Sequence, residues 1–146
     1  MKRIVLGLVA CFALLQLRAG EVDWQTDLPK AQAKAKAEKK LVMMDFTGSD
    51  WCIWCHRLDS EVFSKPEFVD YAKTNLVTVE VDFPRAKKQT EEQKKANQEL
   101  LEKYKIKGYP TIIVLNGEGE QVGELGYMPG GPKAFIAELE KLRKKT

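Results

Sequence analysis

The sequence predicts an α/β fold in which a mixed central sheet carries helices on both faces. Short runs of β-branched and other apolar residues alternate with longer segments of helical composition. A helical crossover joins the first two predicted strands, which implies that they pair in parallel. A turn signal joins the last two predicted strands, which implies an antiparallel hairpin. The chain has 146 residues and no visible internal repeat, so we expect one domain.

The first half of the chain is expected to alternate helices with strands. Residues 27–40 are rich in Ala, Lys and Gln and predict an early helix. Residues 41–46 (Leu-Val-Met-Met-Asp-Phe) predict a buried strand, because all but one are apolar. After a short loop, a helix is expected over 52–63, followed by a further helical piece at 66–75. Residues 76–82 are dense in β-branched side chains and predict the second strand.

The second half is expected to contain a helix, a hairpin and a closing helix. Residues 90–104 predict a charged helix with a solvated face. Residues 111–115 (Thr-Ile-Ile-Val-Leu) predict a strand, and the turn signal Asn-Gly-Glu-Gly at 116–119 returns the chain into 120–127. Residues 132–144 predict an amphipathic helix, because their apolar side chains fall on one side.

The N-terminus differs in composition from the remainder of the chain. Lys2 and Arg3 precede the uncharged, mostly apolar stretch 4–17, which is shorter than the roughly 20 residues of a membrane span. This pattern is typical of a secretory signal, so we expect a signal peptide at 1–19, cleaved after Ala19. The mature domain is then 20–146.

Two alternatives for the leader remain open. Residues 8–11 (Leu-Val-Ala-Cys) resemble a bacterial lipobox, and lipidation of Cys11 would anchor the protein to a membrane. The apolar stretch continues past Cys11 to Leu17, however, where a mature lipoprotein usually turns polar. An uncleaved leader would also act as an anchor.

Charge argues against a role in binding nucleic acid. The full chain has 24 Lys and Arg residues and 21 Asp and Glu residues, for a net charge of +3. Three of the basic residues, Lys2, Arg3 and Arg18, fall in the predicted leader, which holds no acid. The mature chain is therefore expected to have no net charge, whereas binding to phosphates needs a basic surface.

The cysteines point to redox chemistry. Of the three in the chain, Cys11 belongs to the leader, which leaves Cys52 and Cys55. The loop between these two is too short to staple a fold, so the pair is better interpreted as reactive. Cys52 is expected at the N-terminus of a helix, where backbone N–H groups stabilise a thiolate. Cys55, one turn further, can attack a mixed disulfide on Cys52, and we expect only one of the two sulfurs to be exposed.

The residues 52–56, Cys-Ile-Trp-Cys-His, also match the pattern for covalent attachment of a c-type haem. Met43, Met44 or Met128 could then supply a second axial ligand. Met43 and Met44 fall on a predicted core strand, where packing explains them better. His56 is more simply a helix-surface residue or one that tunes the charge of the cysteines. A structural zinc site needs four ligands, so we expect no metal and no cofactor.

Two motifs carry a family resemblance. Residues 46–55 (Phe-Thr-Gly-Ser-Asp-Trp-Cys-Ile-Trp-Cys) resemble the thioredoxin superfamily, in particular secreted bacterial thioredoxin-like proteins with a Trp-Cys-x-Trp-Cys centre. Residues 103–111 (Lys-Tyr-Lys-Ile-Lys-Gly-Tyr-Pro-Thr) look like the second signature of that family. The resemblance implies a thioredoxin-like three-layer fold and a protein thiol–disulfide oxidoreductase.

The resemblance also implies roles for individual residues. It assigns Asp45 to proton transfer with the inner cysteine, although an Asp satisfied by backbone groups at a strand end is the simpler alternative. Asp45 lies one residue further from the cysteines than the commonest spacing in the family. Trp51, Trp54, Tyr109 and Pro110 are the expected substrate-binding residues, with Pro110 in a cis peptide bond. The remaining tryptophan near the N-terminus is expected to anchor that segment by packing.

The expected partners are thiols or disulfides of exported proteins and an unidentified redox partner, in the periplasm or outside the cell. A membrane is a partner only if the leader is retained or Cys11 is lipidated. A c-type electron carrier and a non-catalytic thioredoxin-like binding module remain alternative functions, and the intact cysteine pair argues against the second.

Overall fold

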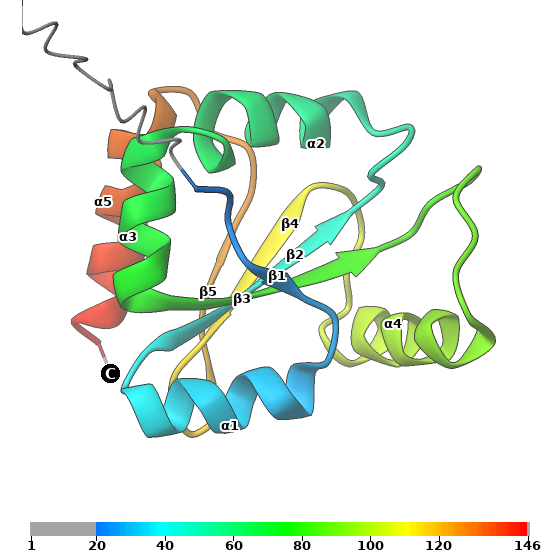
Figure 1. Cartoon of the computed structure of the whole chain (residues 1–146), viewed down its shortest axis with the longest axis horizontal. Coiled ribbons are helices and arrows are strands. Elements are labelled where there is room, and N and C mark those ends of the chain that lie inside the picture. The colour runs from blue at the N-terminus through cyan, green and yellow to red at the C-terminus, as the bar shows by residue number, and fades with distance from the viewer. Residues whose placement is uncertain (1–19, 146) are drawn as a thin grey trace, which may run out of the picture.

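The computed structural model describes residues 20–145, and the predicted signal peptide lies outside them. The chain forms one five-stranded sheet with helices on both faces (Figure 1). The elements in order are β1 (Trp24–Gln25), α1 (Leu28–Glu38), β2 (Leu41–Thr47), α2 (Ile53–Leu58), the π-helix η1 (Asp59–Phe63), α3 (Pro66–Asn75), β3 (Leu76–Asp82), α4 (Glu91–Lys103), β4 (Thr111–Leu115), β5 (Gln121–Leu125) and α5 (Gly131–Arg143).

The sheet has the mixed pairing that the sequence predicts. Its strand order is β1-β3-β2-β4-β5. β2 pairs in parallel with β3 and antiparallel with β4, and β4 and β5 form the antiparallel hairpin. Helices α1 and α4 lie on one side of the sheet, while α2, α3 and α5 lie on the other (Figure 1). The predicted three-layer architecture is therefore confirmed.

Alternation along β2 divides the core in two. Val42, Met44 and Phe46 point to the α1 side, while Leu41 and Met43 point to the side of α3 and α5. All five are buried, because a central strand covered on both faces has no solvated side. Asp45 follows Met43 by two positions, so its carboxylate lies on the same side as Met43, towards α2.

Helix termini follow the local sequence. Asp27 caps α1, and its side chain accepts the N–H of Lys30 at 3.0 Å. Prolines stand in the first turn of α1, α3 and α5, where their missing N–H groups cost nothing. Asn116 organises the hairpin turn, since its side chain accepts the N–H groups of Glu118 and Glu120.

Two elements were not predicted. β1 has two residues and pairs with β3 through Trp24 and Thr78, which is too short for a periodic pattern to reveal. The helix predicted over 52–63 is present, but its second half continues as the π-helix η1. Such wide turns change the hydrogen-bond pattern without a clear sequence signal, and they are frequent at functional sites.

Within residues 20–145, no helix combines the length and the apolar character needed to cross a membrane.

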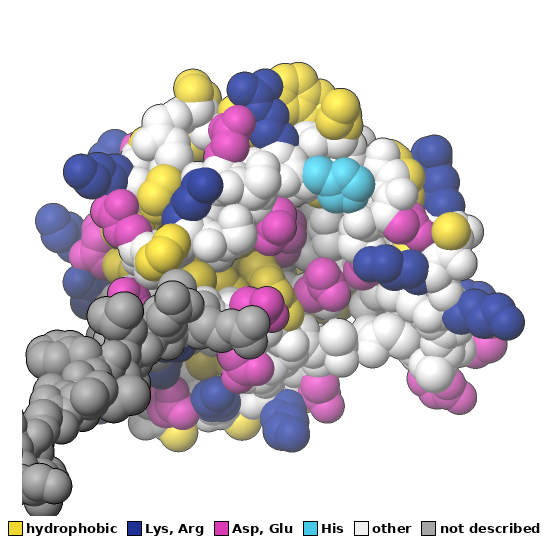
Figure 2. Space-filling model, turned by 45° about the horizontal axis from the view of Figure 1, so that its top comes forward, with side chains coloured by type: hydrophobic (Ala, Val, Ile, Leu, Met, Phe, Trp, Pro, Cys, Tyr) yellow, Lys and Arg dark blue, Asp and Glu magenta, His cyan; other side chains and the backbone are white. Residues whose placement is uncertain are grey.

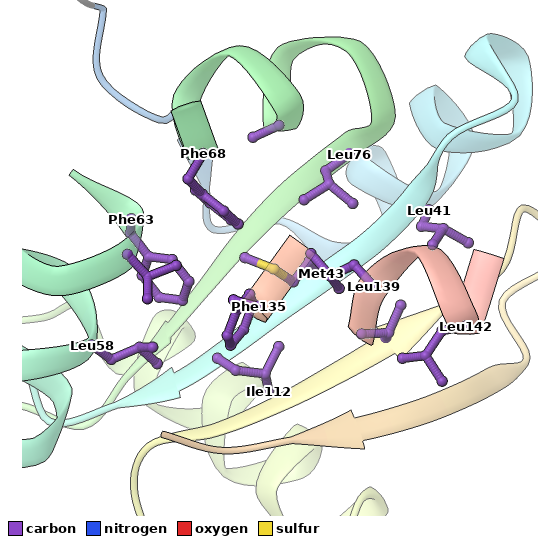
Figure 3. Close-up of a cluster of buried hydrophobic side chains, with 13 residues drawn as sticks. Leu41, Met43, Leu58, Phe63, Phe68, Leu76, Ile112, Phe135, Leu139 and Leu142 are labelled. Carbon is purple, nitrogen blue, oxygen red and sulfur yellow. The ribbon is translucent and has the colours of Figure 1, made fainter. Parts of the chain in front are cut away.

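Three phenylalanines form the centre of the core on the side of α3 and α5. Phe63, Phe68 and Phe135 gather beside Met43 (Figure 3). The ring centroid of Phe135 lies 5.6 Å from that of Phe63 and 5.9 Å from that of Phe68. This cluster ties α5 to α3 and to the end of η1, the element that follows the cysteine helix.

Substituting Phe135 with Ala is expected to lower the free energy of unfolding by about 3–5 kcal/mol, since it leaves a cavity among fully buried rings. Urea denaturation followed by circular dichroism measures the loss. Lys133→Ala, at an exposed position of the same helix, should change stability by no more than about 0.5 kcal/mol. Equal effects of the two variants would contradict the assigned packing.

Candidate functional site

The two cysteines lie where the loop after β2 enters α2. Cys52 is the N-cap residue of α2, and its Sγ accepts the N–H of Cys55 at 3.2 Å. The two side chains form a disulfide, with their Cα atoms 5.2 Å apart. When the disulfide is reduced, a sulfur at this position faces the unpaired N–H groups of a helix start, which favour its thiolate form.

The loop that carries Cys52 is fixed by short-range and long-range contacts. The N–H of Cys52 donates to the carbonyl oxygen of Gly48 at 2.8 Å. Ser49 donates through its N–H (2.9 Å) and its hydroxyl (2.5 Å) to the two carboxylate oxygens of Asp82, at the end of β3. A Cβ on Gly48 would lie 2.4 Å from the indole of Trp51, so this position needs glycine. The neighbouring strand therefore holds the loop before the cysteines.

Exposure does not distinguish the two cysteines. In the disulfide form, Cys52 and Cys55 are each 6% exposed, so the expectation that only one sulfur is exposed is wrong for this state. What separates them is their surroundings, since Cys55 lines a cavity beneath α2 and Cys52 does not.

That cavity is acidic and holds about 260 Å³. It lies between the end of the sheet, the cysteine helix and the N-terminal segment. Its lining residues are Trp24, Asp45, Thr47, Ser49, Cys55, His56, Asp59, Phe63 and Glu80. Figure 2 looks onto this face and shows the histidine beside a hollow bordered by acidic side chains.

Asp45 is the most deeply buried acid of the cavity. It is 8% exposed, and its Oδ1 has no hydrogen-bond partner among the described residues. Burial, reinforced by the negative charges of Glu80, Asp59 and Asp82, raises the pKa of Asp45 to about 8. An acid satisfied at a strand end by backbone groups would not leave one oxygen unpaired, so the simpler alternative does not describe this residue.

Two further acids of this cavity were missed from the sequence. Glu80 stands directly opposite Asp45 in the β2–β3 register. Burial and the charge of Asp82 raise the pKa of Glu80, while Lys87 opposes the shift. Burial likewise raises the pKa of Asp59, and the charge of His56 opposes it. The available signal was the alternation of polar side chains in 76–82, which places Glu80 on the face of Asp45.

His56 lies on the exposed side of α2, as one sequence interpretation expected. Its Nε2 is 2.8 Å from the carbonyl oxygen of Ser49, so it also contacts the cysteine loop. Trp24, the predicted packing anchor, meets Phe63 edge-on with centroids 5.3 Å apart and borders the same cavity. Within residues 20–145, no group of three or more His, Cys, Asp or Glu side chains is arranged to hold a metal ion.

Trp54 forms an exposed aromatic surface on one side of the cysteines. It is 49% exposed, and its ring centroid is 5.1 Å from that of Tyr127. The guanidinium of Arg57 lies over both rings, at 5.5 and 5.2 Å, and Glu61 holds the Arg57 Nε and the Tyr127 hydroxyl, both at 2.7 Å. Ile53, 75% exposed, extends this apolar surface. Only Trp54 of this cluster was predicted.

Trp51 and Tyr109 form a more buried aromatic group on the other side. The Trp51 Nε1 donates to the carbonyl oxygen of Phe83 at 2.8 Å, and the ring of Tyr109 lies 5.7 Å from Trp51 and 5.5 Å from Phe83. Burial raises the pKa of Tyr109. The Tyr109–Pro110 peptide bond is cis, as the resemblance implies. Because β4 begins directly after Pro110 and is antiparallel to β2, this bond lies at the sheet edge where the cysteine loop begins.

Comparison with known proteins supports the interpretation of the fold and of the cysteines. A family model described as a thioredoxin-like domain matches residues 28–143. The disulfide bond reductase DsbH of Chlamydia pneumoniae is 35% identical over 128 residues, which cover 88% of this chain and 76% of that protein. A solved structure of a DsbH oxidoreductase superposes with a TM-score of 0.81 at 36% identity, and the match covers 90% of this chain and 92% of that one.

A second relative, the thioredoxin-related protein DsbJ of Chlamydia pneumoniae, is 28% identical over 130 residues, or 85% of this chain. The match spans 37% of DsbJ, so that protein is much longer than the region compared. The relatives carry names of thiol–disulfide chemistry. They therefore favour that interpretation of the residues 52–56 over attachment of haem.

The raised pKa of Asp45 predicts a particular dependence of stability on pH. The folded protein keeps this proton up to about pH 8, whereas the unfolded chain loses it near the ordinary pKa of 3.8. Wild-type stability should therefore fall as the pH rises through this window, because the folded state binds the extra proton. Asp45→Asn removes the titration. Its free energy of unfolding relative to wild type should rise by at most about 1.4 kcal/mol per pH unit between pH 4 and pH 8 and then level off.

Urea denaturation of the oxidised protein at a series of pH values measures this difference. Asp70→Asn, at an exposed position of α3, is the matched control and should show no such slope. A pH-independent difference between wild type and Asp45→Asn would contradict the burial of an unpaired acid.

Proposed function

The chain belongs to the thioredoxin-like domain family and is a thiol–disulfide oxidoreductase, and we propose that it acts as a reductase of disulfides in exported proteins. The observation that carries the proposal is the Cys52–Cys55 disulfide at the start of α2, beside an acidic cavity. The relative named a disulfide bond reductase supports the direction of the reaction. The predicted signal peptide supports export to the periplasm or beyond.

Cys52 is the proposed nucleophile. In the reduced protein, its thiolate attacks one sulfur of a substrate disulfide and forms a mixed disulfide, while the other substrate sulfur leaves as a thiolate and takes up a proton. The N–H of Cys55, which already points at the Cys52 sulfur, and the positive end of the helix stabilise the attacking thiolate.

Cys55 is the proposed resolving thiol. It attacks Cys52, closes the intramolecular disulfide and releases the second substrate sulfur, so that two electrons and two protons pass to the substrate. We propose that Asp45 accepts the Cys55 proton through the cavity that both line. A carboxyl group with a pKa near 8 can both take up and return a proton at neutral pH.

Trp51, Trp54, Tyr109 and Pro110 are the proposed substrate-binding residues, with Ile53 as an addition from the structure. Trp54 and Ile53 offer exposed apolar surface to the residues around a substrate cysteine. The backbone beside the cis Pro110 is the proposed place where an extended substrate pairs as an added strand. Trp51 contributes through its edge, because its ring is largely covered by its neighbours.

The acids around Cys55 favour reducing activity. A strongly oxidising centre owes its potential to a stabilised reduced form. Here, Asp45, Glu80 and Asp59 line the cavity beside Cys55, and whichever of these acids is ionised opposes a thiolate there by its negative charge. The disulfide is thereby favoured over the dithiol, so electrons flow outward to substrates. A further redox protein must return them, because the mature chain is expected to hold no third cysteine.

Replacing Cys55 with Ala is expected to trap mixed disulfides through Cys52, because the resolving thiol is missing. Incubation with a disulfide-bonded protein should give an adduct that dithiothreitol releases, detectable on non-reducing gels and by mass spectrometry. Cys52→Ala is the matched variant, since it also keeps one thiol, and should form about tenfold less adduct. A greater yield from Cys52→Ala would reverse the assigned roles.

The reduction potential of the Cys52–Cys55 couple is expected to lie near the thioredoxin value of about −270 mV, because nearby acids disfavour the reduced form. Equilibration with dithiothreitol mixtures, quenched by alkylation and read by mass spectrometry, measures it. A potential near about −120 mV would instead indicate a disulfide donor and would overturn the proposed direction.

A further inference from the structure

Arg85 covers the tryptophan that precedes the nucleophile. Its guanidinium carbon lies 4.0 Å from the centroid of the Trp51 ring, a stacked cation–π distance. The same indole packs against Gly48 and donates its N–H to the loop that contains Arg85. A substrate that approaches Cys52 from this side therefore meets a guanidinium, where the sequence predicted an aromatic surface.

The loop between β3 and α4, residues 83–89, is built onto the cysteine loop. The carboxylate of Asp50 accepts the backbone N–H groups of Arg85, Ala86 and Lys87 at 2.9, 2.8 and 2.9 Å. These bonds lower the pKa of Asp50 to about 2, so the anchor stays ionised under physiological conditions. Lys87 adds a hydrogen bond from its Nζ to the Ser49 hydroxyl at 3.0 Å. The position of Arg85 is thus set by residues adjacent to Trp51.

Basic side chains are exposed near Arg85. Arg85 and Lys88 are exposed, and none of the ion pairs within residues 20–145 involves either. Lys105 and Lys107 are exposed in the segment that leads to Tyr109. The ring of Tyr109 packs against that of Phe83, at the start of the loop between β3 and α4. Figure 2 shows basic side chains, with acidic ones between them, on the side of the molecule where Figure 1 places the loop between β3 and α4.

Arg57, the other arginine near the cysteines, differs from Arg85. It also stacks on a tryptophan, but its Nε is paired with Glu61 at 2.7 Å. Beneath α2, the cavity carries the carboxyl groups of Asp45, Asp59 and Glu80. The two sides therefore differ: on the Trp51 side Arg85 has no ion pair among the described residues and the nearby Asp50 carboxylate is satisfied by backbone N–H groups, whereas several acids lie under the helix.

We propose that Arg85 binds an acidic side chain next to the reactive cysteine of the protein substrate. The inference rests on the proposed function and names a substrate class for it. With one face on the indole, the guanidinium keeps donors at its edge for a carboxylate, to which it can bind in bidentate geometry. Because Trp51 directly precedes Cys52, an acid close in sequence to the attacked cysteine reaches Arg85 while the mixed disulfide forms. Lys88, Lys105 and Lys107 add attraction at longer range.

Three synthetic disulfide peptides test the proposal. They differ only in the two residues flanking one cysteine, which are Glu, Gln or Lys. The reduced wild-type protein should react fastest with the Glu peptide and slowest with the Lys peptide, and salt at about 0.5 M should reduce the difference, since exposed charges are screened. Rates are read from acid-quenched samples by chromatography.

Variants at Arg85 give the decisive comparison. Arg85→Gln should lower the rate with the Glu peptide about two- to fivefold and leave the Gln peptide unchanged, while Arg85→Glu should favour the Lys peptide. Lys34→Gln removes one positive charge from an exposed position of α1, on the face of the sheet opposite to the cysteine helix α2, and should keep the wild-type order. Circular dichroism checks that each variant is folded.

Equal rates with the three peptides, or an equal loss with all three in Arg85→Gln, would overturn the docking role of Arg85. The proposed function would survive that result, because the peptides would still be reduced. Inertness towards all three peptides, in a protein whose own disulfide exchanges with dithiothreitol, would instead overturn the proposed function and the docking role with it.

Discussion

The central position of β2 is the constraint on which the site depends. Because β2 is parallel to β3 and antiparallel to β4, the carboxyl ends of β2 and β3 meet the amino end of β4 at one edge of the sheet. Three segments start or end there: the cysteine loop, the loop that carries Arg85, and the Tyr109–Pro110 bond. The strands are covered on both faces, so their positions are set by core packing. The loops at this edge start from these well-defined positions, and the hydrogen bonds to Asp82 and Asp50 fix them further.

The two cysteines occupy different surroundings, and the proposed order of the steps of thiol exchange rests on this difference. A helix start stabilises negative charge on Cys52, whereas the acids of the cavity disfavour a second negative charge on Cys55. In the proposed mechanism, Cys52 therefore attacks as a thiolate, and Cys55 remains a thiol until the mixed disulfide exists. Asp45 is the proposed acceptor of the Cys55 proton in this order of steps. Its carboxyl group is buried, one of its oxygens has no hydrogen-bond partner among the described residues, and its pKa of about 8 is close to neutral pH. Burial alone raises the pKa of Asp45, and the negative charge of the neighbouring Glu80 raises it further.

Most of the fold could be predicted from the sequence, because buried positions recur as runs or periodic patterns of apolar residues. The runs 41–46, 76–82 and 111–115 predicted the strands β2, β3 and β4, and the cysteine and proline motifs are short local patterns. The residues that were missed depend on register or on loop conformation. Glu80 faces Asp45 only in the observed β2–β3 register, since a shift of one position would turn it to the other face. β1 is too short to leave a pattern, and the predicted signal peptide lies outside the described residues.

The contact between Arg85 and Trp51 shows why such features escape a reading of sequence alone. It joins residues 34 positions apart in the sequence. It forms because Asp50 binds three successive backbone N–H groups of the loop, and the side chains of that loop do not indicate these bonds. The arrangement also separates two properties of the site. The helix start and the cavity control the ionisation of the cysteines, while the loop between β3 and α4 controls the charge that a substrate meets. Changes in that loop can therefore alter which proteins are recognised and leave the redox chemistry of the Cys52–Cys55 pair intact.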